Sequence, residues 1–72
     1  MASSNKDTAF AAVDSGFCAA IVKALGVLQD SLITDPSASG RQGAQDRFTF
    51  ALKSALDARS VARAVVDTVV TN

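Results

Sequence analysis

The sequence predicts an all-α fold, a single antiparallel hairpin of two helices joined by one loop. Apolar side chains recur every three to four residues over 8–33 and again over 44–70, the period of a helix with one buried face. Between them lies a polar stretch, 34–43, with the only proline. At 72 residues we expect one domain, 1–72, and a lone hairpin has little core of its own.

The first helix is expected over 8–33, after a small, polar and disordered tail over 1–7. The tail is not a cleavable signal peptide, because it lacks the basic start and apolar centre of one. It fits either a frayed terminus or an uncleaved export signal. Asp7 or Thr8 is a suitable N-cap. The core stripe of this helix consists of Phe10, Val13, Phe17, Ile21, Ala24, Leu28 and Leu32.

The loop, 34–43, begins with Asp35-Pro36, which ends the first helix because a residue before proline is pushed out of the α region. Ser39 or Asp46 could cap the second helix, expected over 44–70. Its last residues, from 65 on, are mostly β-branched, so a terminal strand is the alternative. The core stripe of this helix consists of Phe48, Ala51, Leu52, Ala55, Ala62, Val66, Val69 and Val70.

The backs of both helices are less polar than a solvated surface should be. Glycines inside a helix cost about 0.5–1 kcal/mol each relative to alanine, and close approach of another helix would compensate for this. Exposed apolar surface on so short a chain indicates an interface. The candidate assembly face consists of Gly16, Ala19, Gly26, Phe50, Val61 and Val65.

Composition excludes several classes of function. Seven Lys/Arg balance seven Asp, which leaves no basic surface for nucleic acid. There is no His, no phosphate-binding loop and no calcium-loop spacing of Asp, so we expect no enzyme, no catalytic residue, no cofactor, no metal and no small-molecule substrate. Cys18 is alone and is expected to pack as a small hydrophobe, a reactive or intermolecular thiol being the alternative. The longest nearly apolar run, 17–28, is too short to span a membrane.

Charged residues also occur in or beside the two apolar stripes. Asp14 lies in the first stripe, and Arg59 and Arg63 lie in or beside the second. In an antiparallel hairpin Asp14 and Arg63 are about one turn apart. They could form a partly buried ion pair, extend to the rim, or face a neighbouring subunit or an enclosed aqueous space.

The order of features resembles the needle or pilus subunits of bacterial type III secretion systems. Leu32-Ile33-Thr34-Asp35-Pro36-Ser37 matches the family's loop between two helices, and Ala44-Gln45 matches the start of its second helix. The run 58–67, ending in Ala64-Val65-Val66-Asp67, resembles its C-terminal helix. The resemblance covers about residues 28–70. The chain departs from the family in having Phe48 and Phe50 instead of a Tyr-rich centre and Val66 instead of Lys before the last Asp.

The resemblance implies a structural filament subunit, a helical homopolymer with a channel for protein export. Its partners would be itself, the secretion apparatus, export chaperones and unfolded secreted proteins in transit. It would be secreted and form a bacterial cell-surface appendage linked to virulence. By position, the hairpin loop would be Asp35, Pro36 and Ser37, and the lumen or inter-subunit residues would be Gln45, Arg59, Arg63 and Asp67. The alternatives are a dimeric helical-bundle chaperone or adaptor and a small helical protein that is membrane-active or associated with the inner membrane.

Overall fold

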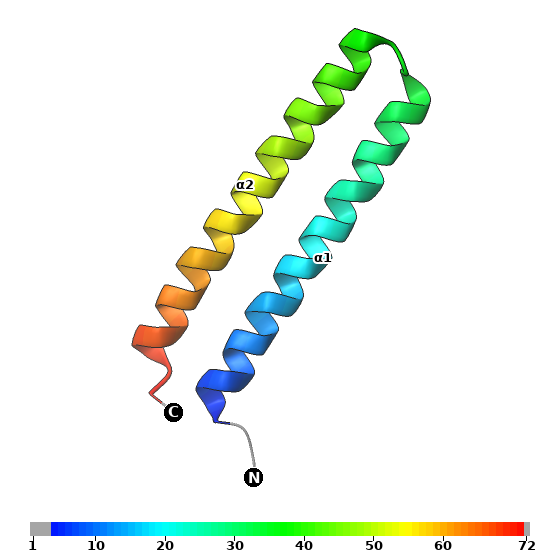
Figure 1. The fold of residues 1–72 in the computed structure, drawn as a ribbon. Helices are drawn as coiled ribbons and strands as arrows, with labels where there is room; N and C mark the ends of the chain where they lie inside the picture. The colour runs from blue at the N-terminus through cyan, green and yellow to red at the C-terminus, as the bar shows by residue number, and fades with distance from the viewer. Residues whose placement is uncertain (1–3, 72) are drawn as a thin grey trace.

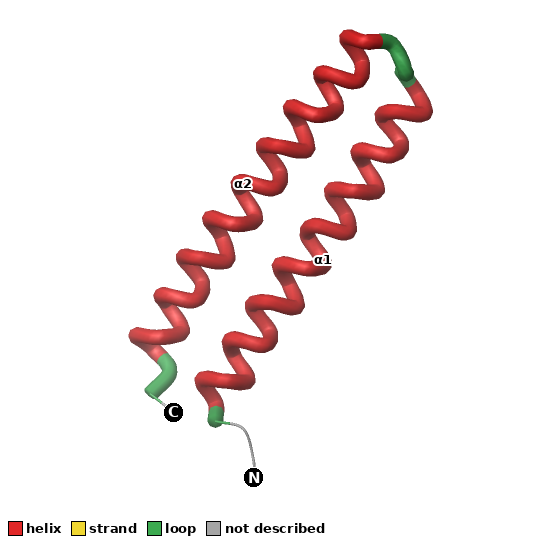
Figure 2. Tube along the Cα trace, in the orientation of Figure 1, coloured by secondary structure: helices red, strands yellow, loops and turns green. Residues whose placement is uncertain are grey.

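Two long helices lie side by side and antiparallel in the computed structural model, which describes residues 4–71 (Figure 1). α1 spans Asn5–Thr34 and α2 spans Ala38–Val69. Residues 4–71 contain no strand, so the predicted all-α hairpin is confirmed. The hairpin is 52 Å long. The start of α1 and the end of α2 lie side by side, at the opposite end of the hairpin from the loop (Figure 2).

α1 begins earlier than the sequence indicated. Ser4 is its N-cap, and the Ser4 Oγ accepts a hydrogen bond of 3.0 Å from the Asp7 backbone N–H. Asp7 and Thr8, the two predicted caps, are therefore inside the helix. The prediction of a disordered tail over 1–7 is wrong for residues 5–7, and residues 1–3 lie outside the described residues. Serine caps a helix as well as aspartate does, so residue type alone does not distinguish Ser4 from Asp7 as the N-cap.

The loop is much shorter than the predicted 34–43, because only residues 35–37 are non-helical. Ser37 caps α2, and its Oγ accepts a hydrogen bond of 3.1 Å from the Gly40 backbone N–H. The proposed caps Ser39 and Asp46 both lie within α2. The glycines that suggested a longer loop are helical residues whose φ angles are not positive.

The last part of α2 is helical as far as Val69, and the Val70 N–H donates to the Val66 carbonyl at 2.9 Å. The alternative of a terminal strand is therefore wrong. β-Branched residues have lower helix propensity, but α2 has α1 beside it along its length and the described residues offer no partner strand.

The contact between the helices follows the spacing of a coiled coil. In α1 the entire predicted core stripe is half-buried. In α2 the half-buried positions recur at intervals of three and four, which keeps one seam facing the partner helix. Val69, predicted to lie in the core stripe of α2, is 71% exposed. The seam also includes half-buried Gly40, Gly43 and Arg59, which the predicted stripe did not contain. Among residues 4–71 only Ala44 is fully buried, at 1% exposure.

Candidate assembly surfaces

Polar contacts between the helices are concentrated near the termini. Arg63 Nη1 lies 3.4 Å from both carboxylate oxygens of Asp14, and the Arg63 guanidinium lies 4.4 Å from the centre of the Phe10 ring. Lys6 Nζ lies 3.3 Å from Asp67 Oδ1. Both ion pairs are partly exposed. We therefore assign them to alignment of the helices and expect little net stability from them.

These contacts bear on the four residues suggested for a lumen or an inter-subunit contact. Arg63 and Asp67 pair with α1 of the same chain, and Arg59 lies 4.5 Å above the centre of the Phe17 ring. Gln45 is exposed near the loop end of α2. The structure therefore brings three of the four together with α1 at one end of the hairpin and leaves Gln45 apart.

A groove runs along one face of the hairpin, between α1 and α2. Three adjoining hollows form it, with volumes of about 220, 440 and 510 Å³ from the termini toward the loop. The first two share Ala20 and Ala55, and the last two share Val27, Ser31 and Arg47. The groove is therefore continuous, and it runs from Ala12 to the loop.

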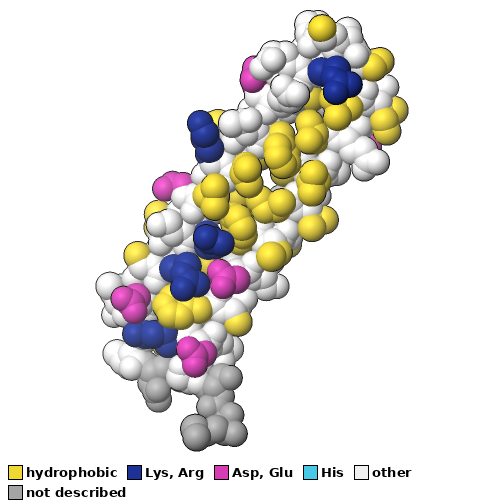
Figure 3. All heavy atoms as spheres, in the orientation of Figure 1, with side chains coloured by type: hydrophobic (Ala, Val, Ile, Leu, Met, Phe, Trp, Pro, Cys, Tyr) yellow, Lys and Arg dark blue, Asp and Glu magenta, His cyan; other side chains and the backbone are white. Residues whose placement is uncertain are grey.

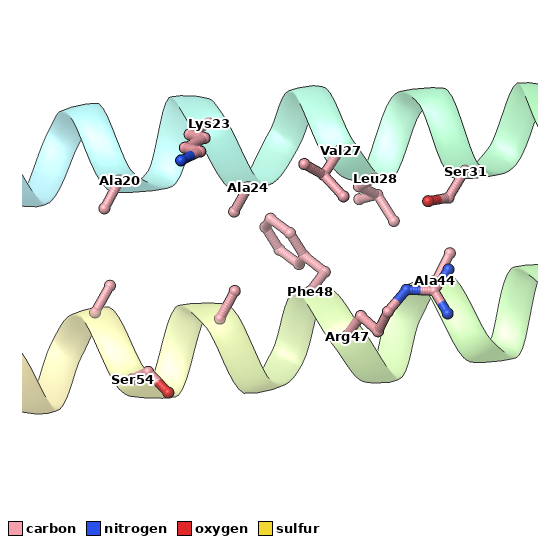
Figure 4. Close-up of a pocket in the computed structure, with 12 residues that line it drawn as sticks. Ala20, Lys23, Ala24, Val27, Leu28, Ser31, Ala44, Arg47, Phe48 and Ser54 are labelled. Carbon is pink, nitrogen blue, oxygen red and sulfur yellow. The ribbon is translucent and has the colours of Figure 1, made fainter.

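The central hollow of this groove is largely apolar (Figure 4). Phe48 is its largest lining side chain and projects from α2 toward α1, while Lys23 and Arg47 lie at its edges. No ion pair involving Lys23 or Arg47 forms within residues 4–71. The remaining lining residues are Ala20, Ala24, Val27, Leu28, Ser31, Ala44, Ala51, Ser54 and Ala55.

Large apolar side chains are exposed around the whole hairpin. The predicted assembly residues Phe50, Val61 and Val65 are all exposed, and so are the small residues Gly16, Ala19 and Gly26. Sequence reasoning missed other exposed members, which lie beside or behind the core stripes except for Val69, assigned to the stripe of the second helix. A search for every large apolar residue outside the stripes would have found most of them. They are Val22, Leu25, Val27, Ile33, Leu56 and Val69.

The helical glycines and the cysteine make no close contact in the hairpin. A Cβ built on Gly16 or Gly26 would meet no atom within 4 Å outside the local helix, so α2 does not approach them closely. Cys18 is exposed, which corrects the expectation that it packs as a small hydrophobe. The wheel position of Cys18 places it beside the seam, where α2 does not cover it.

The loop is held by a short network centred on Asp35. Asp35 Oδ1 accepts a hydrogen bond of 2.7 Å from the Ser37 hydroxyl and one of 3.2 Å from the Ser37 backbone N–H. These two bonds hold the pKa of the Asp35 carboxyl below its ordinary value, the hydroxyl having the larger effect. The network fixes the turn, and all its members are exposed.

Within residues 4–71, no group of three or more His, Cys, Asp or Glu side chains is placed to hold a metal ion. By length and composition α1 is apolar enough to cross a membrane, contrary to the expectation from the run 17–28. The difference arises because alanines and valines on both sides of Lys23 keep the mean hydropathy of α1 high despite this one charge. No family model, curated protein or solved structure matches the chain.

Proposed function

We propose that this chain is the structural filament subunit of a bacterial type III secretion needle or pilus. Copies of the hairpin polymerise into a hollow conduit through which unfolded proteins are exported. One observation carries the self-assembly in this proposal: only Ala44 is buried in the described chain, whereas nine large hydrophobic side chains are at least 43% exposed. The role in export is what the resemblance over residues 28–70 implies. Apolar surface of this extent on a small hairpin favours burial against other chains.

The distribution of this surface supports a polymer over a closed dimer. Exposed apolar side chains occur on α1 at Val22 and Ile33 and on α2 at Phe50 and Val65, on the backs of both helices. A dimer that packs one face of each hairpin would leave the other faces exposed. Neighbours on several sides, as in a helical array, would cover them all.

The test is self-association of the purified protein. We expect concentrated wild-type protein to form filaments, visible by electron microscopy and sedimenting as open-ended polymers. Val65→Asp should abolish filaments, because it places a charge in a subunit contact, while circular dichroism still shows a helical chain. Thr49→Asp, a matched change at an exposed polar site on α2, should still polymerise.

Two results would contradict the proposal. Wild-type protein that stays a monodisperse monomer at high concentration would exclude a filament subunit. A closed dimer of fixed mass would support the dimeric chaperone or adaptor instead.

A second candidate function follows from α1, which is long and apolar enough to cross a membrane and has no fully buried residue along its apolar stretch. This favours a small membrane-inserting protein. Vesicles of phosphatidylcholine and phosphatidylglycerol distinguish the two candidates: a membrane protein floats with the vesicles, and a filament subunit sediments without them.

A further inference from the structure

The side of α2 that points away from α1 carries an aromatic ring among charges. Phe50 is 74% exposed, the largest value of any large hydrophobic side chain in the described chain. Asp46 precedes Phe50 by four residues and Asp57 follows it by seven, so the three share one helix face with Lys53. Asp46 accepts a hydrogen bond of 2.9 Å from Gln42. We call these four residues, Asp46, Phe50, Lys53 and Asp57, the Phe50 ridge.

The central hollow of the groove has complementary features. Its volume of about 440 Å³ exceeds the roughly 150 Å³ that suffices for a benzene ring. Five of its twelve lining residues are alanine, and Phe48 is available for an edge-to-face contact with an entering ring. Lys23 and Arg47 at its edges are cations without an ion-pair partner within residues 4–71. An aromatic ring flanked by carboxylates is thus the ligand that suits this hollow.

We propose that the central hollow binds the Phe50 ridge of a second copy of this chain. The Phe50 ring enters the apolar hollow, and Asp46 and Asp57 face Arg47 and Lys23 of the neighbour. A chain cannot fill its own hollow in this way, because the ridge lies on the side of α2 that points away from α1. The inference rests on the self-assembly proposed above and identifies a contact that would produce it.

The contact is heterologous, because the ridge and the hollow are different surfaces of the same chain. When the ridge of one chain is bound, that chain still presents a free hollow, and its partner still presents a free ridge. Such contacts continue from subunit to subunit and give open-ended arrays unless the rotation closes a ring. The proposed contact therefore supplies the direction that a filament requires.

Photo-cross-linking tests the contact directly. The photoreactive residue p-benzoylphenylalanine replaces Phe50, and after irradiation of the assembled protein the intermolecular adducts are mapped by mass spectrometry. We expect adducts at residues that line the hollow, such as Ala24 and Val27 on α1 and Ala51 on α2, and none at the ridge residues themselves. A control with the same residue in place of Ile33, which is equally exposed but lies off the ridge, should give adducts elsewhere.

Charge reversal gives a second, independent test. Lys23→Asp with Arg47→Asp, or Asp46→Lys with Asp57→Lys, should each raise the critical concentration for assembly at least about tenfold, since each places like charges together. The chain with all four changes should have a critical concentration for assembly within about threefold of the wild-type value. Circular dichroism of each variant verifies that the helices are intact.

The outcomes separate this inference from the proposed function. Two results would overturn the ridge-and-hollow contact and leave the filament proposal standing. One is filaments in which the adducts from position 50 map outside the hollow. The other is a four-change chain whose critical concentration for assembly is no lower than that of either double variant. Adducts between two ridges would overturn this contact as well, since they indicate a symmetric contact. A wild-type chain that never self-associates would overturn both.

Discussion

The half of the hairpin near the termini and the half near the loop are held together by different physical means. Near the termini, Asp14 and Arg63, Lys6 and Asp67, and two arginines over phenylalanine rings join the helices. Toward the loop, the helices meet along apolar side chains such as Leu28 and Phe48. Figure 3 shows the contrast on one face, with charged side chains clustered toward the termini and hydrophobic ones along the middle of the hairpin.

The contrast shows how a chain with almost no core can still have a defined register. Exposed ion pairs contribute little free energy, but their geometry is satisfied at only one alignment of the helices. Apolar contacts are less particular about alignment and contribute more energy per residue. The half near the termini would therefore set the register of the two helices. The half near the loop would supply most of the stabilising free energy and leave a hollow for a neighbouring chain.

The largest expected effect is on the half near the loop. Phe48→Ala removes the largest side chain between the helices there, and because this residue is half-buried we expect a loss of about 2 kcal/mol in free energy of unfolding, below the full-core value. Urea denaturation of dilute, unassembled protein, followed by circular dichroism, measures it. Phe50→Ala, at the exposed phenylalanine two residues away, should change stability by less than about 0.5 kcal/mol. Equal losses would refute the assignment of Phe48 to the cohesive seam.

A pair of glycine substitutions compares the loop end with the terminal half. A Cβ on Gly40 would collide with the carboxyl group and backbone oxygen of Asp35, so Gly40→Ala should destabilise the hairpin by about 1–2 kcal/mol. Gly16→Ala meets no atom within 4 Å and should stabilise it by about 0.5–1 kcal/mol through helix propensity. Thermal unfolding of the two variants checks the opposite signs. A stabilising Gly40→Ala would show that the turn is looser than described.

The half near the termini should show a small and salt-sensitive coupling. In a double-mutant cycle of Asp14→Asn and Arg63→Gln we expect a coupling energy of about 0.5 kcal/mol, because the pair is partly exposed. The coupling should fall in 1 M salt, where charges are screened over about 3 Å. Phe48→Ala should show no such salt dependence. A coupling that persists at high salt would remove the electrostatic distinction between the two halves.

The smallest expected effect is on the acid stability of the turn, through the carboxyl group of Asp35. The folded pKa of Asp35 is lowered, so its contribution to stability is present above the unfolded value near 3.8 and is lost as pH falls through the folded pKa. Asp35→Asn should therefore weaken the decline of melting temperature below about pH 4. In dilute, unassembled protein, Asp57→Asn, a matched change at an exposed carboxylate elsewhere on α2, should retain the wild-type decline. Identical profiles for wild type and Asp35→Asn would contradict the role of this carboxylate.

The sequence predicted the helical stripes well because the period of apolar residues reports directly on the buried face. The helix ends were predicted less well, since several Ser and Asp residues near each end can cap a helix. Ser4 and Ser37 were missed as caps for this reason. From the sequence, the pairing of Asp14 with Arg63 is one of three options, and only the alignment of the helices selects it.

By itself, the sequence determined that this protein has two helices, which face of each is apolar, and that the chain is too small to bury its own apolar surface. Only the tertiary structure decided where the turn lies, which charges pair across the helices and where a groove opens. Periodicity is a property of each helix alone, whereas a pair or a groove depends on the relative alignment of two helices. Here the three-residue turn and the interhelical contacts fix that alignment, with Asp35 and Ser37 at one end and Asp14 and Arg63 toward the other.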